Sequence, residues 1–405
     1  MLGSKTISIA AAFLTAALIN RSLGPSGRGI YAEMVTWVGL FSVIFGISMD
    51  TAIYHFANRE IYGDDDRSRF VTIFSLSLIY ALLATVALTV FVLFLPRQVS
   101  LKTAESVLFL DVLLIVTMLA ANLTVFFQAL GNIRFSALVG IVQSLVIVVI
   151  IGCGYIAGFI DIWFVVVNLI IFQAVALLML FSASLKSGLF TGQFSKNLAR
   201  GIISSGLKQH IATISTFIYM KINQLIVFRY CGASEAGIFA VSLNLAFAAM
   251  FIPTTFQTVL YPRVIHSSDD YEVTVRSLRI GFYSWGLVVL LIILFAEPIL
   301  LLYGGRSFLP SVNIFRILMI AAWFLPLSSI VAPYCVKVGA FNACSASAVL
   351  LGVISIGMNI LLIPKYSGLG AAFATTSTTI IGFCMAIMLL VYLNRKRMKF
   401  YKIEK

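Results

Sequence analysis

The stretch Arg21-Ser-Leu-Gly24-Pro-Ser-Gly-Arg-Gly-Ile-Tyr-Ala32 decides the fold, because a related stretch follows 208 positions later. That second stretch reads Arg229-Tyr-Cys-Gly232-Ala-Ser-Glu-Ala-Gly-Ile-Phe-Ala240. Gly131 and Gly339 stand at the same offset, and in a chain of 405 residues this period is close to half the length. The sequence therefore predicts two copies of one structural unit.

The composition places the chain in a membrane. Hydrophobic residues make up 61% of the chain and charged residues 11%, with a mean hydropathy of +1.05. No soluble domain has this balance, so we expect an all-α, polytopic membrane protein. A membrane helix needs about 20 apolar residues. Twelve stretches qualify, near 3–20, 31–54, 70–95, 106–130, 135–157, 161–183, 203–228, 236–260, 279–303, 312–336, 342–363 and 369–393.

The twelve predicted helices divide into two pseudo-symmetric lobes of six. We expect an N-terminal lobe over 1–183, a cytoplasmic interfacial linker over 184–202, a C-terminal lobe over 203–393 and a basic cytoplasmic tail over 394–405. The first stretch also fits a signal peptide, but its counterpart at 203–228 favours a retained helix. Two homologous lobes of membrane helices are typical of transporters.

The positions of Lys and Arg predict the orientation. Eighteen fall on one side: Lys5, Arg59, Arg67, Arg69, Arg134, Lys186, Lys196, Arg200, Arg263, Arg276, Arg279, Lys337, Arg395, Lys396, Arg397, Lys399, Lys402 and Lys405. Seven fall on the other: Arg21, Arg28, Arg97, Lys102, Arg229, Arg306 and Lys365. Because cytoplasmic loops carry the basic excess, both termini are predicted to be cytoplasmic. The net charge of +13 then indicates contact with anionic membrane lipids, and nucleic acid is not expected as a partner,.

The seventh predicted helix carries the densest set of polar residues: Lys208, His210, Lys221, Asn223 and Gln224. An ionisable side chain near mid-bilayer costs about 2.5–3.5 kcal/mol, so it needs a compensating environment. At 100° per residue, three of the set fall within a sector of about 60°, namely His210, Lys221 and Gln224. This face is expected to line the lobe interface or a water-filled cavity. For Lys221 the alternative is snorkelling to the membrane surface or a structural pair. Lys208 lies nearer the cytoplasmic end and is expected to snorkel.

Five basic residues are candidates for binding a phosphate group, namely Arg21, Arg28, Lys221, Arg229 and Arg316, and the paired Arg21 and Arg229 are expected to form an anion site near the outer mouth. Arg21 and Arg229 end the first helix of each lobe at the same point of the repeat, Arg28 adds charge in one lobe, and Arg316 lies inside the tenth predicted helix. Guanidinium donates two parallel hydrogen bonds to phosphate and stays charged. The alternative is that Arg21 and Arg229 anchor helix ends beside a glycine turn.

Acidic residues in or near the predicted helices are candidates for coupling to H⁺ or Na⁺. They are Glu33, Asp50, Asp111 and Glu297, and each could instead neutralise a nearby arginine. No catalytic constellation and no metal-ligand spacing occurs in the sequence, and the five cysteines show no CxxC pattern,. The sequence therefore predicts neither an enzyme nor a resident cofactor.

Prolines are concentrated in the second half. Seven of the nine lie there, and four fall inside predicted helices, namely Pro253, Pro298, Pro326 and Pro333. Because proline removes a backbone donor and kinks a helix, we expect bent helices in the second lobe. These bends could serve either as gating elements or as static kinks for helix packing.

These motifs resemble the polysaccharide (O-antigen type) flippase family of the superfamily that also holds multidrug-and-toxin exporters and lipid II flippases. The resemblance covers essentially the full chain. It is carried by Arg21-x-Leu-Gly24-Pro-x-Gly-Arg28-Gly29-Ile-Tyr31, by Gly237-Ile-Phe-Ala240, by the stretch from Pro298 to Gly304, and by Asn359-Ile-Leu-Leu-Ile-Pro364-Lys-Tyr-Ser-Gly368-Leu-Gly370-Ala-Ala. Relatives often have an acidic residue where this chain has Asn223, which puts ion coupling at this position in doubt.

The resemblance implies a non-enzymatic flippase that moves an undecaprenyl-diphosphate-linked oligosaccharide across the bacterial inner membrane, in lipopolysaccharide or O-antigen synthesis. It also implies a central cationic cavity and work beside polysaccharide polymerase machinery. The residues favour this reading over an exporter of organic cations, which needs an acid-rich cavity. They also favour it over a membrane enzyme, which needs catalytic groups. A lipid II flippase is a further alternative.

Overall fold

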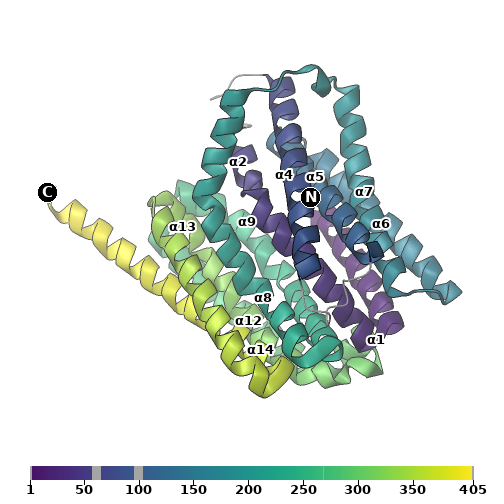
Figure 1. Cartoon of the computed structure of the whole chain (residues 1–405). Helices are drawn as coiled ribbons and strands as arrows, with labels where there is room; N and C mark the ends of the chain where they lie inside the picture. The colour runs from purple at the N-terminus through teal and green to yellow at the C-terminus, as the bar shows by residue number, and fades with distance from the viewer. Residues whose placement is uncertain (1, 57–64, 95–103, 268, 404–405) are drawn as a thin grey trace. The chain divides into compact units, whose positions relative to one another are not determined.

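A computed structural model describes residues 2–56, 65–94, 104–267 and 269–403. Arg59, Arg97, Lys102 and Lys405, which enter the charge distribution above, lie outside this part of the chain. Every regular element among the described residues is helical (Figure 1). The all-α prediction is therefore confirmed.

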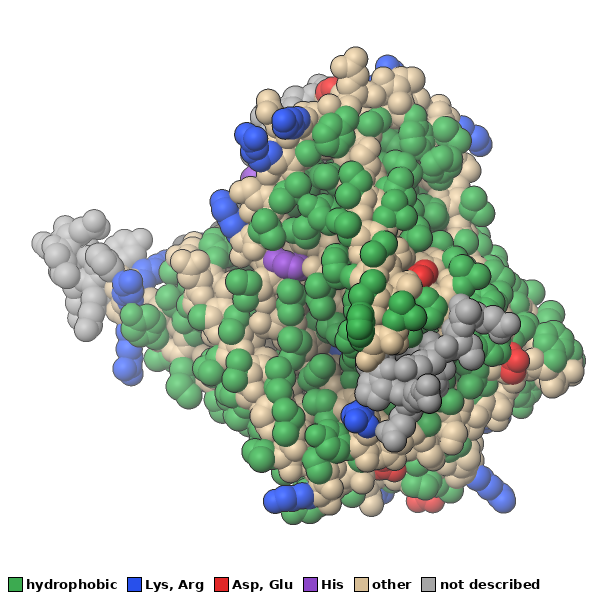
Figure 2. Space-filling model, in the orientation of Figure 1, with side chains coloured by type: hydrophobic (Ala, Val, Ile, Leu, Met, Phe, Trp, Pro, Cys, Tyr) green, Lys and Arg blue, Asp and Glu red, His purple; other side chains and the backbone are tan. Residues whose placement is uncertain are grey.

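Nine of the described helices are long and apolar enough to cross a membrane. Three of them run over 41, 59 and 57 residues, which is far more than the roughly 20 that one crossing needs,. Each of these three contains one residue with non-helical φ and ψ, namely Gly24, Gly232 or Ser367. Counting each broken helix as two gives twelve membrane segments among the described residues, as the sequence predicts. Figure 2 shows hydrophobic side chains spread widely over the face in view.

The chain divides into two compact units, Met1–Ile214 and Ser215–Lys405. The first contains α1 (Leu2–Gly46), α2 (Met49–Phe56), α4 (Asp66–Phe94), α5 (Ala104–Ala129), α6 (Ile133–Ala157), α7 (Ile162–Lys186), η1 (Leu189–Thr191) and the start of α8 (Lys196–Ala249). In this unit α5 packs between α4 and α7, and α1 packs on α6. Phe70, Ile73, Leu123 and Phe126 form part of its fully buried core.

The second unit is also built of helices. It contains the rest of α8, then α9 (Phe251–His266), α10 (Asp270–Leu294), α11 (Ala296–Gly304), η2 (Arg306–Ser311), α12 (Val312–Ile330), α13 (Ala332–Lys337) and α14 (Phe341–Ile403). Here α12 packs on α10 and α14. Figure 1 shows the last turns of α14 running clear of the other labelled helices of this unit.

The repeated glycines are the points where the helices break. Gly24 has φ 62° and ψ −175°, and Gly232 has φ 85° and ψ 178°, so the two copies have nearly the same conformation. Gly131 and Gly339 also match, with φ of 83° and 72°. A side chain makes such conformations costly, which explains why glycine recurs at these offsets.

Three predicted loops are in fact single-residue breaks. The predicted gaps near 21–30, 229–235 and 364–368 are helical on both sides of Gly24, Gly232 and Ser367. One residue outside the helical region is enough to redirect a helix, so no longer connection is needed. Arg28 consequently lies within a helix rather than in a loop, which corrects the prediction.

Two prolines determine where helices end, at points where the sequence predicts continuous membrane spans. The predicted span 279–303 is divided, because α10 ends at Leu294 and α11 begins at Ala296. Pro298 explains this end, since its ring would clash with the carbonyl four residues earlier, at Leu294. Pro253 has the same relation to Ala249, where α8 ends. Pro333 lies in the first turn of α13, so among the four prolines only Pro326 is internal to a helix.

The segment after α7 packs closely on α4. The ring of Phe190 contacts those of Phe70, Phe74 and Phe181, with centroids 4.9, 5.6 and 5.0 Å away. A Cβ built on Gly192 would lie 2.2 Å from the backbone carbonyl carbon of Arg67. This part of the predicted linker therefore belongs to the packed body of the first unit.

Candidate substrate and ion-coupling site

Arg21 and Arg229 occupy equivalent places in the two units. Each lies three residues before the glycine that breaks its helix, and each is exposed. The repeat therefore places one guanidinium beside each break. Because the residues on both sides of each glycine are helical, the direction of the backbone at Arg21 and at Arg229 is fixed.

Arg28 is buried, with 6% of its surface exposed. Its guanidinium carbon lies 4.9 Å from the ring centroid of Tyr31, which is a cation–π distance,. Its Nε is buried without a hydrogen-bond partner among the described residues. A charged group in this position is costly unless neighbours compensate, so the aromatic contact helps to hold it.

The three acidic candidates of the first unit have different surroundings. Glu33 is buried and accepts a 3.4 Å hydrogen bond from Nε1 of Trp37. Asp111 is half-buried, and its Oδ2 accepts a 2.7 Å bond from the hydroxyl of Thr89. Asp50 is exposed in the first turn of α2. The three side chains therefore differ in exposure, and these two hydrogen bonds come from different helices.

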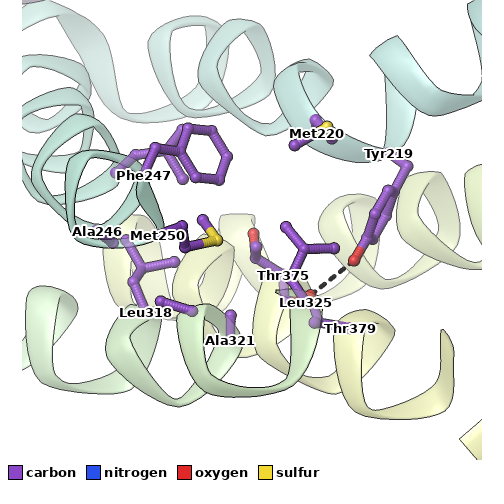
Figure 3. A pocket seen from close by; sticks show the side chains of 12 residues that line it. Tyr219, Met220, Ala246, Phe247, Met250, Leu318, Ala321, Leu325, Thr375 and Thr379 are labelled. Carbon is purple, nitrogen blue, oxygen red and sulfur yellow. Dashed lines mark hydrogen bonds between the residues drawn. The ribbon is translucent and has the colours of Figure 1, made fainter. Parts of the chain in front are cut away.

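Lys221 and Phe247 face each other within the second unit. The ammonium nitrogen of Lys221 lies 4.9 Å from the ring centroid of Phe247. Phe247 also lines a small pocket between α8, α12 and α14, about 10 Å³ in volume, which is roughly the space that one water molecule occupies,. Figure 3 shows the side chains of Tyr219, Met250 and Thr375 directed into the same space. A cationic group is therefore held at the aromatic wall of a pocket.

The polar groups of this pocket form a short chain of hydrogen bonds. The hydroxyls of Tyr219 and Thr379 lie 2.8 Å apart (Figure 3). Asn223 donates from Nδ2 to Oγ1 of Thr375 at 2.9 Å, and Asn223 is fully buried. These two contacts tie α8 to α14 between residues that are 160 and 152 positions apart in the sequence. Asn223 is therefore engaged in a neutral amide–hydroxyl contact.

Gln224 has a structural partner. Its Nε2 donates to the carbonyl oxygen of Ala236 at 3.0 Å, and the side chain is 3% exposed. Ala236 lies beyond the break at Gly232, so this bond spans the break in α8. The amide thus links the helical segments on the two sides of the break.

The remaining predicted residues lie apart from this pocket. His210 belongs to the first unit and is partly buried, with a buried Nδ1 that has no hydrogen-bond partner among the described residues. Arg316 lies on α12 of the second unit, where its Nη1 is 3.5 Å from Oδ1 of Asn313, a long and weak contact,. The five predicted phosphate-binding residues are thus distributed over both units.

The hydroxyl groups of the pocket were not among the site residues predicted from the sequence. Tyr219, Thr375 and Thr379 carry no charge, and an uncharged hydroxyl in an apolar helix gives a weak signal. The run Ala-Thr-Thr-Ser-Thr-Thr over 374–379 was the available clue, since it concentrates hydroxyls within one span. Within the part of the chain that the structure describes, no three His, Cys, Asp or Glu side chains gather as a metal site.

A comparison with known protein families shows which family the chain belongs to. The family model described as "Polysaccharide biosynthesis protein" matches residues 1–268. The chain belongs to the polysaccharide biosynthesis protein family. No curated protein matches its sequence.

Solved structures share the fold of this family member. An inward-facing multidrug resistance MATE transporter of the MOP superfamily aligns with a TM-score of 0.68 and 16% identity, over 96% of both chains. Lipid II flippase MurJ, in an inward closed conformation, aligns with a TM-score of 0.69 and 15% identity, over 96% of this chain and 86% of MurJ. A MOP superfamily transporter from Pyrococcus furiosus aligns with a TM-score of 0.63 and 15% identity, over 96% and 95%. At these identities the similarity establishes the fold, a multi-pass membrane architecture shared with MOP superfamily transporters.

Proposed function

We propose that this protein is a flippase that translocates an undecaprenyl-diphosphate-linked oligosaccharide across the bacterial inner membrane for surface polysaccharide synthesis. The match to the polysaccharide biosynthesis family carries the proposal. The fold shared with MOP superfamily transporters, lipid II flippase MurJ among them, supports a transport step within that process.

The physical problem explains why basic residues are expected in such a protein. A diphosphate and a sugar head group lose their hydration in about 30 Å of hydrocarbon, which is prohibitive without compensation. Guanidinium and ammonium groups lower this barrier by pairing with phosphate. We assign Arg21, Arg28, Lys221, Arg229 and Arg316 to this role, with His210 and Gln224 as polar neighbours. Arg28 is buried, and Gln224 donates its hydrogen bond to the carbonyl of Ala236. These two side chains can therefore contact the cargo only after a rearrangement.

We propose that alternating access moves the cargo, with the two units changing their relative arrangement during the cycle. H⁺ or Na⁺ is the proposed coupling ion, with Asp50, Glu33, Asp111 and Asn223 as candidate positions. Polysaccharide polymerase machinery is the proposed partner that receives the translocated product.

Two variants test this function in a strain that lacks the native copy. Arg21→Gln combined with Arg229→Gln should reduce surface polysaccharide and leave lipid-linked repeat units accumulated on the cytoplasmic leaflet. Arg200→Gln removes an exposed charge in the linker region and is the matched control. Normal polysaccharide output from the double variant would contradict the assignment of these arginines. Normal output from the deletion strain would contradict the flippase itself.

Export of small molecules is the second candidate, because a multidrug resistance MATE transporter shares the fold. An exporter predicts that deletion sensitises cells to organic cations while surface polysaccharide stays normal. The flippase predicts the reverse. Measuring both quantities in one deletion strain separates the two functions.

A further inference from the structure

An apolar groove runs along the second unit between α9, α10 and α12. Its volume is about 560 Å³, within the range of sites that hold organic ligands,. Its walls include Ile252 and Phe256 from α9, Ile280 and Val288 from α10, and Leu327 from α12. Phe256 and Ile280 are 71% and 59% exposed, so the groove opens outward from this unit. The groove is separate from the pocket beside Lys221.

The floor of the groove is fixed by hydrogen bonds around a proline. Pro326 has no N–H, so the carbonyl of Ala322 loses its usual helical donor. The indole Nε1 of Trp285 supplies a donor to that carbonyl at 2.9 Å. Gln257 donates from Nε2 to the carbonyl of Pro326 at 2.7 Å. Both polar groups are therefore used internally. Apart from Arg263 at one end and the hydroxyls of Ser277 and Ser284, the rest of the lining is apolar.

The length of the groove matches one leaflet. On α9 its lining extends from Ile252 to Arg263. At 1.5 Å per residue this is about 16 Å, close to half of the roughly 30 Å hydrocarbon core. Arg263 is exposed and lies at one end of the groove. The distribution of Lys and Arg predicts that this end is cytoplasmic.

We propose that the groove binds an anionic phospholipid of the cytoplasmic leaflet, with one acyl chain between α9 and α10 and the phosphate at Arg263. An acyl chain spans one leaflet, and the groove has that depth. An undecaprenyl tail is far longer, so most of it would remain outside. A basic residue near the membrane surface contributes about 1 kcal/mol toward an anionic lipid, which corresponds to about a fivefold preference. This site is independent of the flippase proposal.

Photolabelling of the full-length protein tests the site. The protein is reconstituted in phosphatidylcholine vesicles that contain phosphatidylglycerol with a photoreactive group on one acyl chain, and labelled peptides are mapped by mass spectrometry. We expect label on the groove residues of α9 and α10. Photoreactive phosphatidylcholine with the same chain should give about fivefold less label there.

Two pairs of variants sharpen the test. Arg263→Gln should lower labelling by phosphatidylglycerol about fivefold, whereas Arg279→Gln, which removes an exposed charge on the opposite face of α10, should not,. Ser284→Phe should fill the groove and remove the label, whereas Leu290→Phe on the opposite face should not.

Three results would overturn the proposal. These are equal labelling by both phospholipids, unchanged labelling in Arg263→Gln and Ser284→Phe, or groove labelling by photoreactive undecaprenyl phosphate in the absence of labelling by phosphatidylglycerol. The last result would assign the groove to the cargo tail. Because the vesicles contain no cargo, none of these results bears on the test of transport.

Discussion

Gly24 and Gly232 show how a single residue directs a membrane helix. Both combine a positive φ with an extended ψ, a region that is essentially restricted to glycine,. No heavy atom would lie within 4 Å of a Cβ at either site. The requirement for glycine therefore comes from the backbone conformation and not from crowding.

Replacing either glycine with alanine should destabilise the protein by about 1–3 kcal/mol, the cost of holding a side chain in this region. Thermal unfolding in detergent measures the loss. Gly357→Ala is the matched control, because Gly357 lies in the interior of α14 with the same open surroundings and no positive φ. The control should be neutral or slightly stabilising. Equal destabilisation by all three variants would show that the breaks carry no special conformational cost.

The candidate site was predictable where charge or amide groups marked it. Lys221, Asn223 and Gln224 stand out as polar residues in an apolar helix, and the structure places Lys221 and Asn223 at or beside the pocket. The hydroxyl partner Thr375 was not predicted, because a contact between residues 152 positions apart depends on the packing of α8 on α14. Burial of Arg28 could not be predicted for the same reason.

At the scale of a helix, α12 shows how a membrane protein accommodates an internal proline. The carbonyl that Pro326 leaves without a helical donor is satisfied from another helix, by Trp285 of α10. In hydrocarbon no water is available for this purpose, so a neighbouring side chain has to replace it. The internal proline and the α10–α12 contact therefore depend on each other.

Trp285→Phe should cost about 1–3 kcal/mol beyond its packing effect, because the carbonyl of Ala322 is left unsatisfied. Adding Pro326→Ala restores the backbone N–H and should recover most of that hydrogen-bonding loss. The free energy of unfolding of both single variants and the double variant gives the coupling between the two positions. Trp323→Phe is the control, since its Nε1 donates to the carbonyl of Phe282 in a part of α10 without proline. Strictly additive effects of Trp285→Phe and Pro326→Ala would contradict this account.

The segment between α7 and α8 is held by backbone proximity as well as by aromatic contacts. The backbone N–H groups of Gln193 and Ser195 donate to the hydroxyls of Ser68 and Thr72 on α4, at 3.2 and 3.0 Å. Gly192 lies so close to the backbone of Arg67 that a side chain has no room. The segment can therefore keep this position only with glycine at 192.

Gly192→Ala should release the segment from α4 and expose the basic residues on either side of it. We expect trypsin to cleave faster at Lys186, Lys196 and Arg200, all of which lie on the surface already and need only local unfolding,. Gly152→Ala, which adds a Cβ in open space on α6, should leave the cleavage rate unchanged. An unchanged rate in Gly192→Ala would mean that the chain relieves the contact without detaching the segment.

Across the whole molecule, the internal repeat predicted more than composition did. The 208-residue offset correctly relates the breaks at Gly24 and Gly232 and the turns at Gly131 and Gly339. It did not predict that in three pairs of membrane segments the two helices are separated by a single non-helical residue instead of a loop. Hydropathy falls at such a polar position whether the connection is one residue or a longer loop. The strained Ile47, with φ 49°, gave no signal in the sequence at all. Its carbonyl lies against Gly206 of α8, a contact that only the folded unit defines.

The distribution of basic residues predicts the orientation of the whole protein. With 18 Lys and Arg on one side and 7 on the other, the C-terminus should lie in the cytoplasm,. Alkaline phosphatase fused after Lys405 should be inactive, because this enzyme requires export, whereas a fluorescent protein at that position should fold. A phosphatase fusion at Gly158, in the turn between α6 and α7, should be active. The opposite pattern would invert the topology. It would also place Arg263 at the outer surface, so that the groove would take its anionic lipid from the other leaflet.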